Sequence, residues 1–139
     1  PIDHFQEYTG SIYPIDFRSI CYLRVGGQRH TADEEESLFP GLRAESGTGR
    51  FEELGRLEDD HGNANQLHAA VDTLYSTWIA DGLLSPEDEQ RLLSAVEQLG
   101  HLYEEHIQVE EKIVFPHAVE ALDNQAIAAM GQEFRARRG

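Results

Sequence analysis

One pattern occurs twice in this chain of 139 residues, and its spacing restricts the fold more than any other feature. The first copy begins at His30 and the second at His106, and both read His-x-x-x-Glu-Glu-x-x-[Leu/Val]-Phe-Pro. A single match of this kind could arise by chance in an acidic helix, but two copies with identical spacing are hard to explain that way. The four-residue step from His to Glu places both side chains on one helix face, one turn apart.

The two copies predict a shared polar interior. Two helices facing each other would present His30 and Glu34, together with His106 and Glu110, to one space. A carboxylate can bridge two cations, and neutral imidazole is a good ligand for iron, zinc or copper. The alternative is that both pairs are solvated surface pairs. Glu110 argues against this alternative, because it continues an apolar stripe in which an unpaired carboxylate would be costly.

Apolar residues at steps of three and four predict two long amphipathic helices, at about 51–80 and 86–115. Ser85-Pro86-Glu87-Asp88 is a strong start for the second, because Ser can cap the helix and Pro suits its first turn. The stripe of the first helix is Leu54, Leu57, His61, Ala64, His68, Val71, Tyr75 and Trp78. That of the second is Leu92, Val96, Leu99, Tyr103, His106, Glu110 and Ile113.

The remaining segments are also read as helical. Segment 15–38 is expected to be a helix, whereas residues 1–14 are a weakly assigned N-terminal segment. A short C-terminal helix is expected at 124–138. Its inward side chains would be Ile127, Met130 and Phe134. No alternating strand pattern stands out, so we expect one all-α domain, an up-down helical bundle, over residues 1–139.

Proline is expected to end or kink both motif helices. Pro40 and Pro116 close the two copies, and a helix-interior proline lacks the N–H that the preceding turn needs. Pro40 and Gly41 are therefore read, with 45–50, as a loop. The Phe that precedes each proline, Phe39 or Phe115, is expected to form an apolar wall of the interior space.

His61 is the next candidate ligand. It lies about 20 residues before the turn between the two long helices, and His106 lies about 20 residues after that turn, so an antiparallel pair would bring them to the same height. The alternative for a lone His in an apolar stripe is a hydrogen-bonded core residue. His68 follows His61 by seven residues, about 10 Å along the axis, and is a more distant candidate ligand.

Charge and composition exclude several classes of partner. The chain carries 26 Asp and Glu against 11 Lys and Arg, a formal net charge of −15. Nucleic acid and anionic membrane surfaces both require a basic face, so neither is an expected partner. Cys21 is the single cysteine, and there is neither an apolar run of membrane-spanning length nor a recognisable signal peptide. These features lead us to expect a cytoplasmic protein.

The paired motif, Asp60-His61 between its copies and the tail Glu133–Arg138 resemble the hemerythrin-like, or HHE cation-binding, domains. The resemblance covers about residues 28–138. It implies a four-helix bundle with a non-haem di-iron site. It also implies that the family's ligands correspond to His30, Glu34, His61, His106 and Glu110. Known roles in the family are oxygen carriage, sensing of oxygen, nitric oxide or redox state, and iron handling.

The chain departs from the family pattern at two points. Many members have a second His one turn after the position of His61, where this chain has Asn65. The family's first helix normally supplies another His, but if a turn lies near residues 10–14, His4 would differ in height from His30 by about 15 Å. A short, irregular or missing first helix would leave fewer nitrogen ligands and more open positions. Reversible oxygen carriage is then less favoured than sensing, redox chemistry or iron binding.

Three functions remain open from the sequence. The leading one is a di-iron module that binds a small diatomic, O2 or NO, or senses redox or iron state. The second is a di-iron oxidase or peroxidase on the same ligands, with peroxide as a substrate, although no further substrate motif is visible. The third is a metal-free acidic helical interaction module. Because bundles with an incomplete helix often dimerise, a homodimer is a further expectation.

Overall fold

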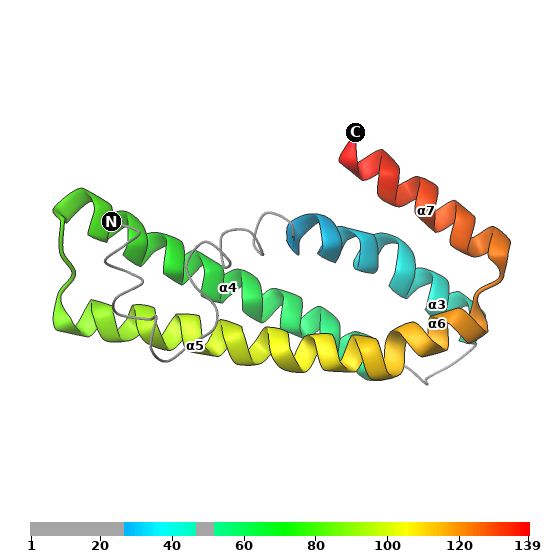
Figure 1. Ribbon diagram of the computed structural model, residues 1–139, viewed down its shortest axis with the longest axis horizontal. Coiled ribbons are helices and arrows are strands. Elements are labelled where there is room, and N and C mark those ends of the chain that lie inside the picture. Colours follow the sequence, from blue (N-terminus) through cyan, green and yellow to red (C-terminus); the bar gives the residue numbers. More distant parts are fainter. Residues whose placement is uncertain (1–26, 47–51) are drawn as a thin grey trace. The chain divides into compact units, whose positions relative to one another are not determined.

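The computed structural model describes residues 27–46 and 52–139, which are helical almost throughout (Figure 1). Within these two ranges there is no strand, so the all-α prediction is confirmed. His4 and the part of the predicted helix before residue 27 lie outside the described residues. In chain order the elements are helical residues 27–33, η1 (Glu34–Leu38), α3 (Phe39–Ser46), α4 (Glu52–Asp81), α5 (Pro86–Val109), η2 (Glu110–Val114), α6 (Phe115–Ala121) and α7 (Asn124–Arg138).

The chain divides into two compact units. Among the described residues, unit 1 is Gly62–Glu104, and unit 2 combines 27–46 and 52–61 with Glu105–Gly139. The long helices α4 and α5 each contribute to both units, because the boundaries fall within them. That residues 1–139 form a single domain stays a prediction.

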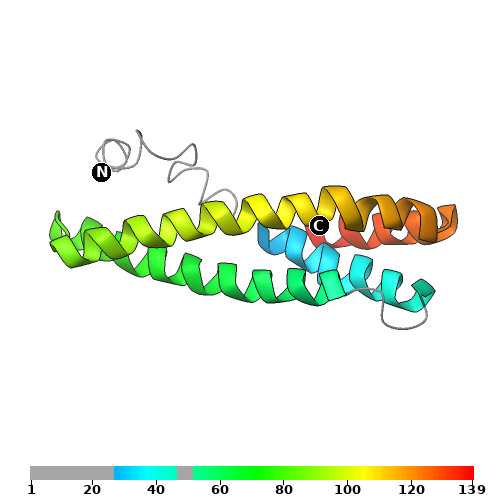
Figure 2. The same ribbon diagram turned by 90° about the horizontal axis from the view of Figure 1, so that it is seen from below.

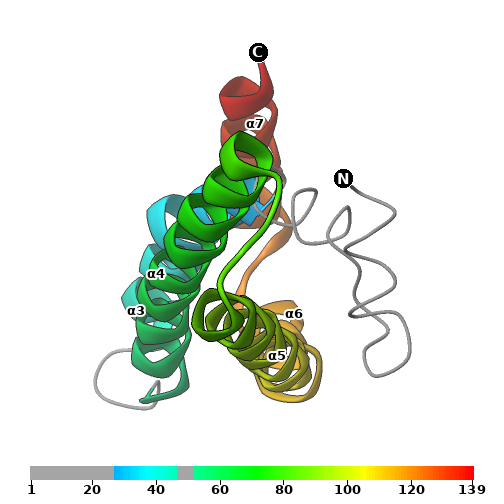
Figure 3. The same ribbon diagram turned by 90° about the vertical axis from the view of Figure 1, so that its left-hand side faces the viewer.

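Unit 1 is a pair of helical segments, from α4 and α5, joined by a short turn (Figure 3). The turn begins at Gly82, whose φ of 75° is a left-handed conformation that favours glycine. Ser85 then caps α5, since its Oγ accepts a hydrogen bond from the Asp88 N–H at 3.1 Å, as the start signal predicted. The buried core consists of Ala64, Val71, Leu92, Ala95, Val96 and Leu99.

Unit 2 has its own apolar core, which joins the helix of residues 27–46 to α4 and to the continuous helix formed by η2 and α6. Its fully buried members come from all three stretches of chain, so packing fixes the three helices against one another. The core consists of Phe39, Leu42, Leu54, Leu57, Val114 and Leu122. Full burial of an aliphatic side chain contributes about 1.5–3 kcal/mol, and this cluster is therefore the main apolar support of the polar residues beside it.

Both motif helices continue through their prolines (Figure 2), so of the two predicted effects of Pro40 and Pro116, an end or a kink, the end is wrong. A wide π-helical turn precedes each proline, η1 before Pro40 and η2 before Pro116. In each turn the N–H of the Phe donates to the carbonyl of the motif Glu five residues earlier. The wide turn absorbs one extra residue, so the proline meets the preceding turn without the clash that ends an ordinary helix. Pro40 and Gly41 are accordingly helical, not a loop.

The same wide turn corrects the predicted stripe of the second long helix. Ile113 was expected to face inward, but it is 43% exposed, and Val114 is fully buried in its place. An α-helical count places residues 113 and 114 on either side of the face of Glu110. The wide turn of η2 holds more residues, which rotates 113 away from that face and leaves 114 as the inward residue. Upstream of η2 the predicted stripe holds, with Leu92, Val96 and Leu99 buried.

α7 runs back beside the helix of residues 27–46 (Figure 1) and is attached by ion pairs near its end and by Ala126 and Met130, which pack against the core of unit 2. Asp123 caps its start by accepting a hydrogen bond from the Ala126 N–H at 2.7 Å. No residue of α7 is buried. Of the three side chains expected to face inward, Met130 and Phe134 are half-buried, whereas Ile127 is 48% exposed. Near its end, Arg137 and Arg138 both pair with the buried Asp33.

No helix among the described residues has the length and apolar character needed to cross a membrane.

Candidate metal centre

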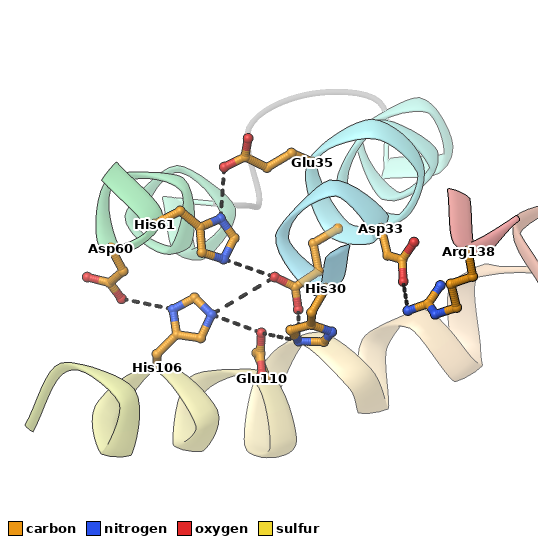
Figure 4. A network of polar contacts seen from close by, with 9 residues as sticks. His30, Asp33, Glu35, Asp60, His61, His106, Glu110 and Arg138 are labelled. Atoms are coloured by element: carbon orange, nitrogen blue, oxygen red, sulfur yellow. Dashed lines mark hydrogen bonds and ion pairs between the residues drawn. The ribbon is translucent and has the colours of Figure 1, made fainter. Parts of the chain in front are cut away.

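Three helices of unit 2 bring five of the six predicted metal ligands together (Figure 4). His30 and Glu34 come from the helix of residues 27–46, His61 comes from α4, His106 from α5, and Glu110 begins η2. The four-residue spacing of the two motif copies works as predicted, because each His lies beside the Glu of its own copy. The distance from Nε2 to Oε1 is 2.8 Å for His30 and Glu34, and 3.0 Å for His106 and Glu110.

One group of candidate ligands is entirely buried. It comprises Glu34, His61 and His106, whose ligand atoms all lie within 4.8 Å of one another. Nε2 of His61 is 3.0 Å from Glu34 Oε2, and Nε2 of His106 is 4.0 Å from the same oxygen. One carboxylate oxygen therefore faces two imidazole nitrogens from two different helices.

A second group shares Glu34 and reaches the surface. It comprises His30, Glu34 and Glu110, again with ligand atoms within 4.8 Å of one another. His30 Nε2 lies 2.8 Å from Glu34 Oε1 and 3.7 Å from Glu110 Oε1. The His30 side chain is 55% exposed, whereas both carboxylates are almost fully buried. Glu34 thus offers Oε2 to the buried group and Oε1 to the half-exposed one.

The buried carboxylates lack hydrogen-bond partners. Both oxygens of Glu34 and Oε1 of Glu110 are buried with no hydrogen bond, although imidazole nitrogens lie close by. A buried polar group without a partner costs about 1–3 kcal/mol, and more when it is charged. A cation among these atoms removes that cost, and mixed carboxylate and imidazole donors suit a first-row transition metal. The residues present therefore fit a metal ion.

In the metal-free protein, protons on the imidazoles compensate the carboxylates. The nearby carboxylates of Glu110 and, next, Glu34 raise the pKa of His30 to about 10. Burial alone would lower the pKa of His61, but the Glu34 and Glu35 carboxylates outweigh it and raise that pKa. Burial alone would raise the pKa of Glu110, yet contacts with His106 and His30 hold it well below its usual range. A cation and protons therefore compete for one set of atoms.

Residues 13–118 match a family model described as the hemerythrin HHE cation binding domain. The chain belongs to the hemerythrin HHE cation-binding family. No curated protein and no solved structure gives a significant match to it. The matched range contains all five clustered residues and ends within α6. Helix α7, with the tail that the sequence resemblance included, lies beyond it.

Membership of the HHE family gives the helical bundle and the His/Glu cluster a common explanation. An HHE domain binds cations, and the cluster supplies candidate ligands for them. His68, the sixth predicted ligand, belongs to neither group. It lies in unit 1, where its Nε2 is hydrogen-bonded to Tyr103 Oη at 2.7 Å, so its role as a ligand stays a prediction. Asn65, which replaces the second His of many HHE domains, is exposed.

The predicted apolar walls differ between the two copies of the motif. Phe39 is fully buried, and its ring is nearly parallel to that of His61, with centroids 6.2 Å apart. Phe115 is 37% exposed, and the prediction that it forms a second wall is therefore wrong. The inward position of the second copy belongs to Val114, one residue earlier.

Two polar contacts of the cluster were missed by sequence reasoning. Glu35 Oε1 lies 2.8 Å from Nδ1 of His61, and Asp60 Oδ2 lies 3.3 Å from Nδ1 of His106 (Figure 4). Each acid adjoins a predicted ligand in sequence, Glu34 or His61, and adjacency was the available signal. It was weak, because the chain has 26 acidic residues and most positions beside a ligand are exposed.

The buried Asp33 was missed for a different reason. It precedes Glu34 and accepts from Arg137 at 3.0 Å and from Arg138 at 2.5 Å. Burial alone would raise the pKa of Asp33, but the two guanidinium groups lower it. No local pattern links residue 33 to residues more than 100 positions away, so this pairing needs the tertiary fold.

Proposed function

We propose that this HHE domain holds two non-haem iron ions and uses them to bind a small diatomic, O2 or NO, or to respond to redox or iron state. The observation that supports this most strongly is the position of Glu34. It belongs to both ligand groups, and each of its buried oxygens faces a different one. A carboxylate in that position is suited to bridging two cations.

The residues divide into a buried and an accessible set. His61 and His106 would bind the inner ion through Nε2, the nitrogen nearer Glu34 in each ring. His30 and Glu110 would bind the outer ion with the other oxygen of Glu34. Iron suits this mixture of imidazole and carboxylate, and when bound it supplies reversible electron transfer and affinity for small diatomics.

Access favours a small ligand that enters beside His30. This imidazole is half-exposed, while the other four ligands are buried. Phe39 lies against His61 on the interior side and excludes water there. Because the described residues offer three clustered imidazoles, coordination positions remain for water or a small molecule. That open coordination supports sensing or redox chemistry more than stable oxygen carriage.

The experiment is metal analysis of freshly isolated protein, paired with two substitutions. We expect two irons per chain in the wild type, reduced metal content in Glu110→Gln, and unchanged content in Glu111→Gln. Glu110 is buried in the cluster, whereas Glu111 is its exposed neighbour on the same helix. Full metal content in Glu110→Gln would contradict the ligand assignment.

The same preparation separates the other two functions. Sustained turnover of peroxide by the iron-loaded protein would favour an oxidase or peroxidase on these ligands. Protein that takes up no iron, zinc or copper under reducing conditions would leave an acidic helical interaction module. An optical spectrum of the iron-loaded protein that changes reversibly with O2 or NO, or with reduction and reoxidation, would support the proposal.

A further inference from the structure

We infer that Glu35 and Asp60 are positioning residues that fix which nitrogen of His61 and of His106 binds the metal. The inference rests on the proposed function, because it assumes that the cluster holds a cation. It assigns a role to two acids that are not themselves part of either ligand group.

The two imidazoles are held in the same way. In each ring Nε2 faces the shared interior and Nδ1 faces a carboxylate outside it, Glu35 for His61 and Asp60 for His106 (Figure 4). An ionised carboxylate only accepts hydrogen bonds, so the ring must donate from Nδ1. The proton is thereby placed on Nδ1, and the lone pair of Nε2 points toward the cluster.

The supporting acids differ from the ligand carboxylates in exposure. The side chain of Glu35 is 40% exposed and that of Asp60 is 19% exposed, against 2% for Glu34. Water can therefore solvate the supporting acids while each keeps one oxygen on an imidazole. A negative charge at Nδ1 raises the basicity of the ring and strengthens its bond to a metal.

The contacts also tie the three helices of the site together. Glu35, on the helix of residues 27–46, holds His61 of α4, and Asp60, also of α4, holds His106 of α5. His30, on the helix of residues 27–46, faces Glu110 at the start of η2. This contact connects the third helix of the site back to the first. The ring centroids of His61 and His106 are 4.9 Å apart, so each supporting acid holds one of two neighbouring imidazoles.

The test uses Glu35→Gln and Asp60→Asn, which keep the shape of each side chain and remove its charge. Glu36→Gln and Asp59→Asn are the matched controls, since Glu36 pairs with Arg137 and Asp59 is exposed. Zn²⁺ affinity is measured by competition with a chelator. We expect about 10–100-fold weaker binding for each test variant and no change for the controls. Circular dichroism of each metal-free variant verifies that its helices are intact.

A second measurement separates positioning from general weakening. In Zn²⁺-loaded protein with ¹⁵N-labelled histidine, NMR should show protonated Nδ1 and metal-bound Nε2 for both rings. Glu35→Gln should move the Nδ1–H signal of His61 alone, and Asp60→Asn that of His106 alone. A loss of stability without a change of hydrogen bonding would not give this residue-specific pattern.

Two results would overturn the inference, and they are distinguishable. If the wild type binds Zn²⁺ but the test variants match their controls in affinity and in both Nδ1–H signals, the positioning role is wrong while the metal site stands. If NMR shows that Zn²⁺ is bound through Nδ1 of His61 or His106, the positioning role is likewise wrong and the metal site again stands. If the wild type binds neither Zn²⁺ nor iron, the proposed function fails and this inference fails with it.

Discussion

Single residues of the cluster are specialised although the two motif copies look alike. His30 and His106 occupy equivalent places in the pattern, yet the first is half-exposed and the second buried. The difference matters chemically, because an exposed imidazole can exchange its metal bond with water while a buried one cannot do so easily. The candidate metal site is therefore asymmetric, with a closed side at His61 and His106 and an open side at His30.

The two phenylalanines of the motif allow a stability test. Phe39→Ala removes a fully buried ring that lies against His61, and we expect a loss of about 3–5 kcal/mol in the free energy of unfolding. Phe115→Ala, at the equivalent position of the second copy, removes a ring that is 37% exposed and should cost clearly less. Urea unfolding measures both. Equal losses would mean that Phe39 is not part of the core of unit 2.

Sequence reasoning succeeded at residues whose role depends on local spacing. His30 with Glu34 and His106 with Glu110 follow from a four-residue step on a helix, and His61 follows from counting along two helices. Glu35, Asp60 and the pairing of Asp33 were missed, because each contact joins different helices. Such contacts depend on how helices are rotated against one another, which no local pattern specifies.

At the scale of elements, the long helices were predicted closely and their irregular turns were not. The apolar stripe predicted a first long helix at 51–80, and α4 spans Glu52–Asp81, so each end is correct to within one residue. The cap at Ser85 predicted the start of α5 at Pro86, as observed. The wide turns η1 and η2 have no simple sequence signal apart from the proline that follows. Each proline suggested that its helix ends there. A helix can instead continue through a proline when a π-helical turn precedes it, as both motif helices do.

The attachment of α7 gives a prediction at this scale. Arg137→Ala removes one of two guanidinium groups from the buried Asp33 and also the contacts with Glu36 and Ser37. We expect a lower urea midpoint than in the wild type, because a buried carboxylate loses part of its compensation. Arg135→Ala is the control, since Arg135 is an exposed cation on the same helix.

Salt provides an independent measure of that attachment. Because the contacts of Arg137 are ionic and partly exposed, the difference between Arg137→Ala and the wild type should shrink in concentrated salt. A difference that is unchanged by salt, or a midpoint equal to that of Arg135→Ala, would show that charge does not hold α7 in place.

A glycine pair tests the turn between α4 and α5. Gly82→Ala places a side chain at a φ of 75° and should cost about 1–2 kcal/mol of unfolding free energy. Gly62→Ala lies inside α4 with no heavy atom within 4 Å of the new methyl group, and should gain about 0.5–1 kcal/mol. Opposite signs in urea unfolding are the expected result, and a stabilising Gly82→Ala would contradict the role of this turn.

For the whole molecule, the balance of charge links stability to metal. The chain has a formal net charge of −15, and the oxygens of Glu34 and Glu110 that lack a hydrogen bond are buried within it. Burying these carboxylates without a cation destabilises the folded state. A metal ion that binds only the folded state raises the free energy of unfolding by mass action. Family membership and the buried oxygens without hydrogen bonds are independent observations, and both lead us to expect that a cation stabilises the fold.

Metal should therefore stabilise the whole fold by a measurable amount. With Fe²⁺ or Zn²⁺ at about 100 times its Kd, we expect the free energy of unfolding to rise by about 2.7 kcal/mol for one site. Thermal unfolding with and without a chelator measures the change as a shift in Tm. Glu110→Gln should lose the part of the shift that the outer ion contributes, and Glu111→Gln should lose none. An identical Tm in both conditions would show that metal does not bind to the folded state.

The paired wide turns change how positions in this chain must be numbered for comparison. Up to each motif Glu, inward residues are found by counting α-helical turns forward from the His; beyond it, η1 and η2 each hold one residue more per turn, and that count no longer applies. Anyone who grafts the second copy onto a straight helix, or aligns it with a sequence that lacks the wide turn, would bring Ile113 back toward the inward face. The proline, and not the histidine, is the proper landmark for everything downstream.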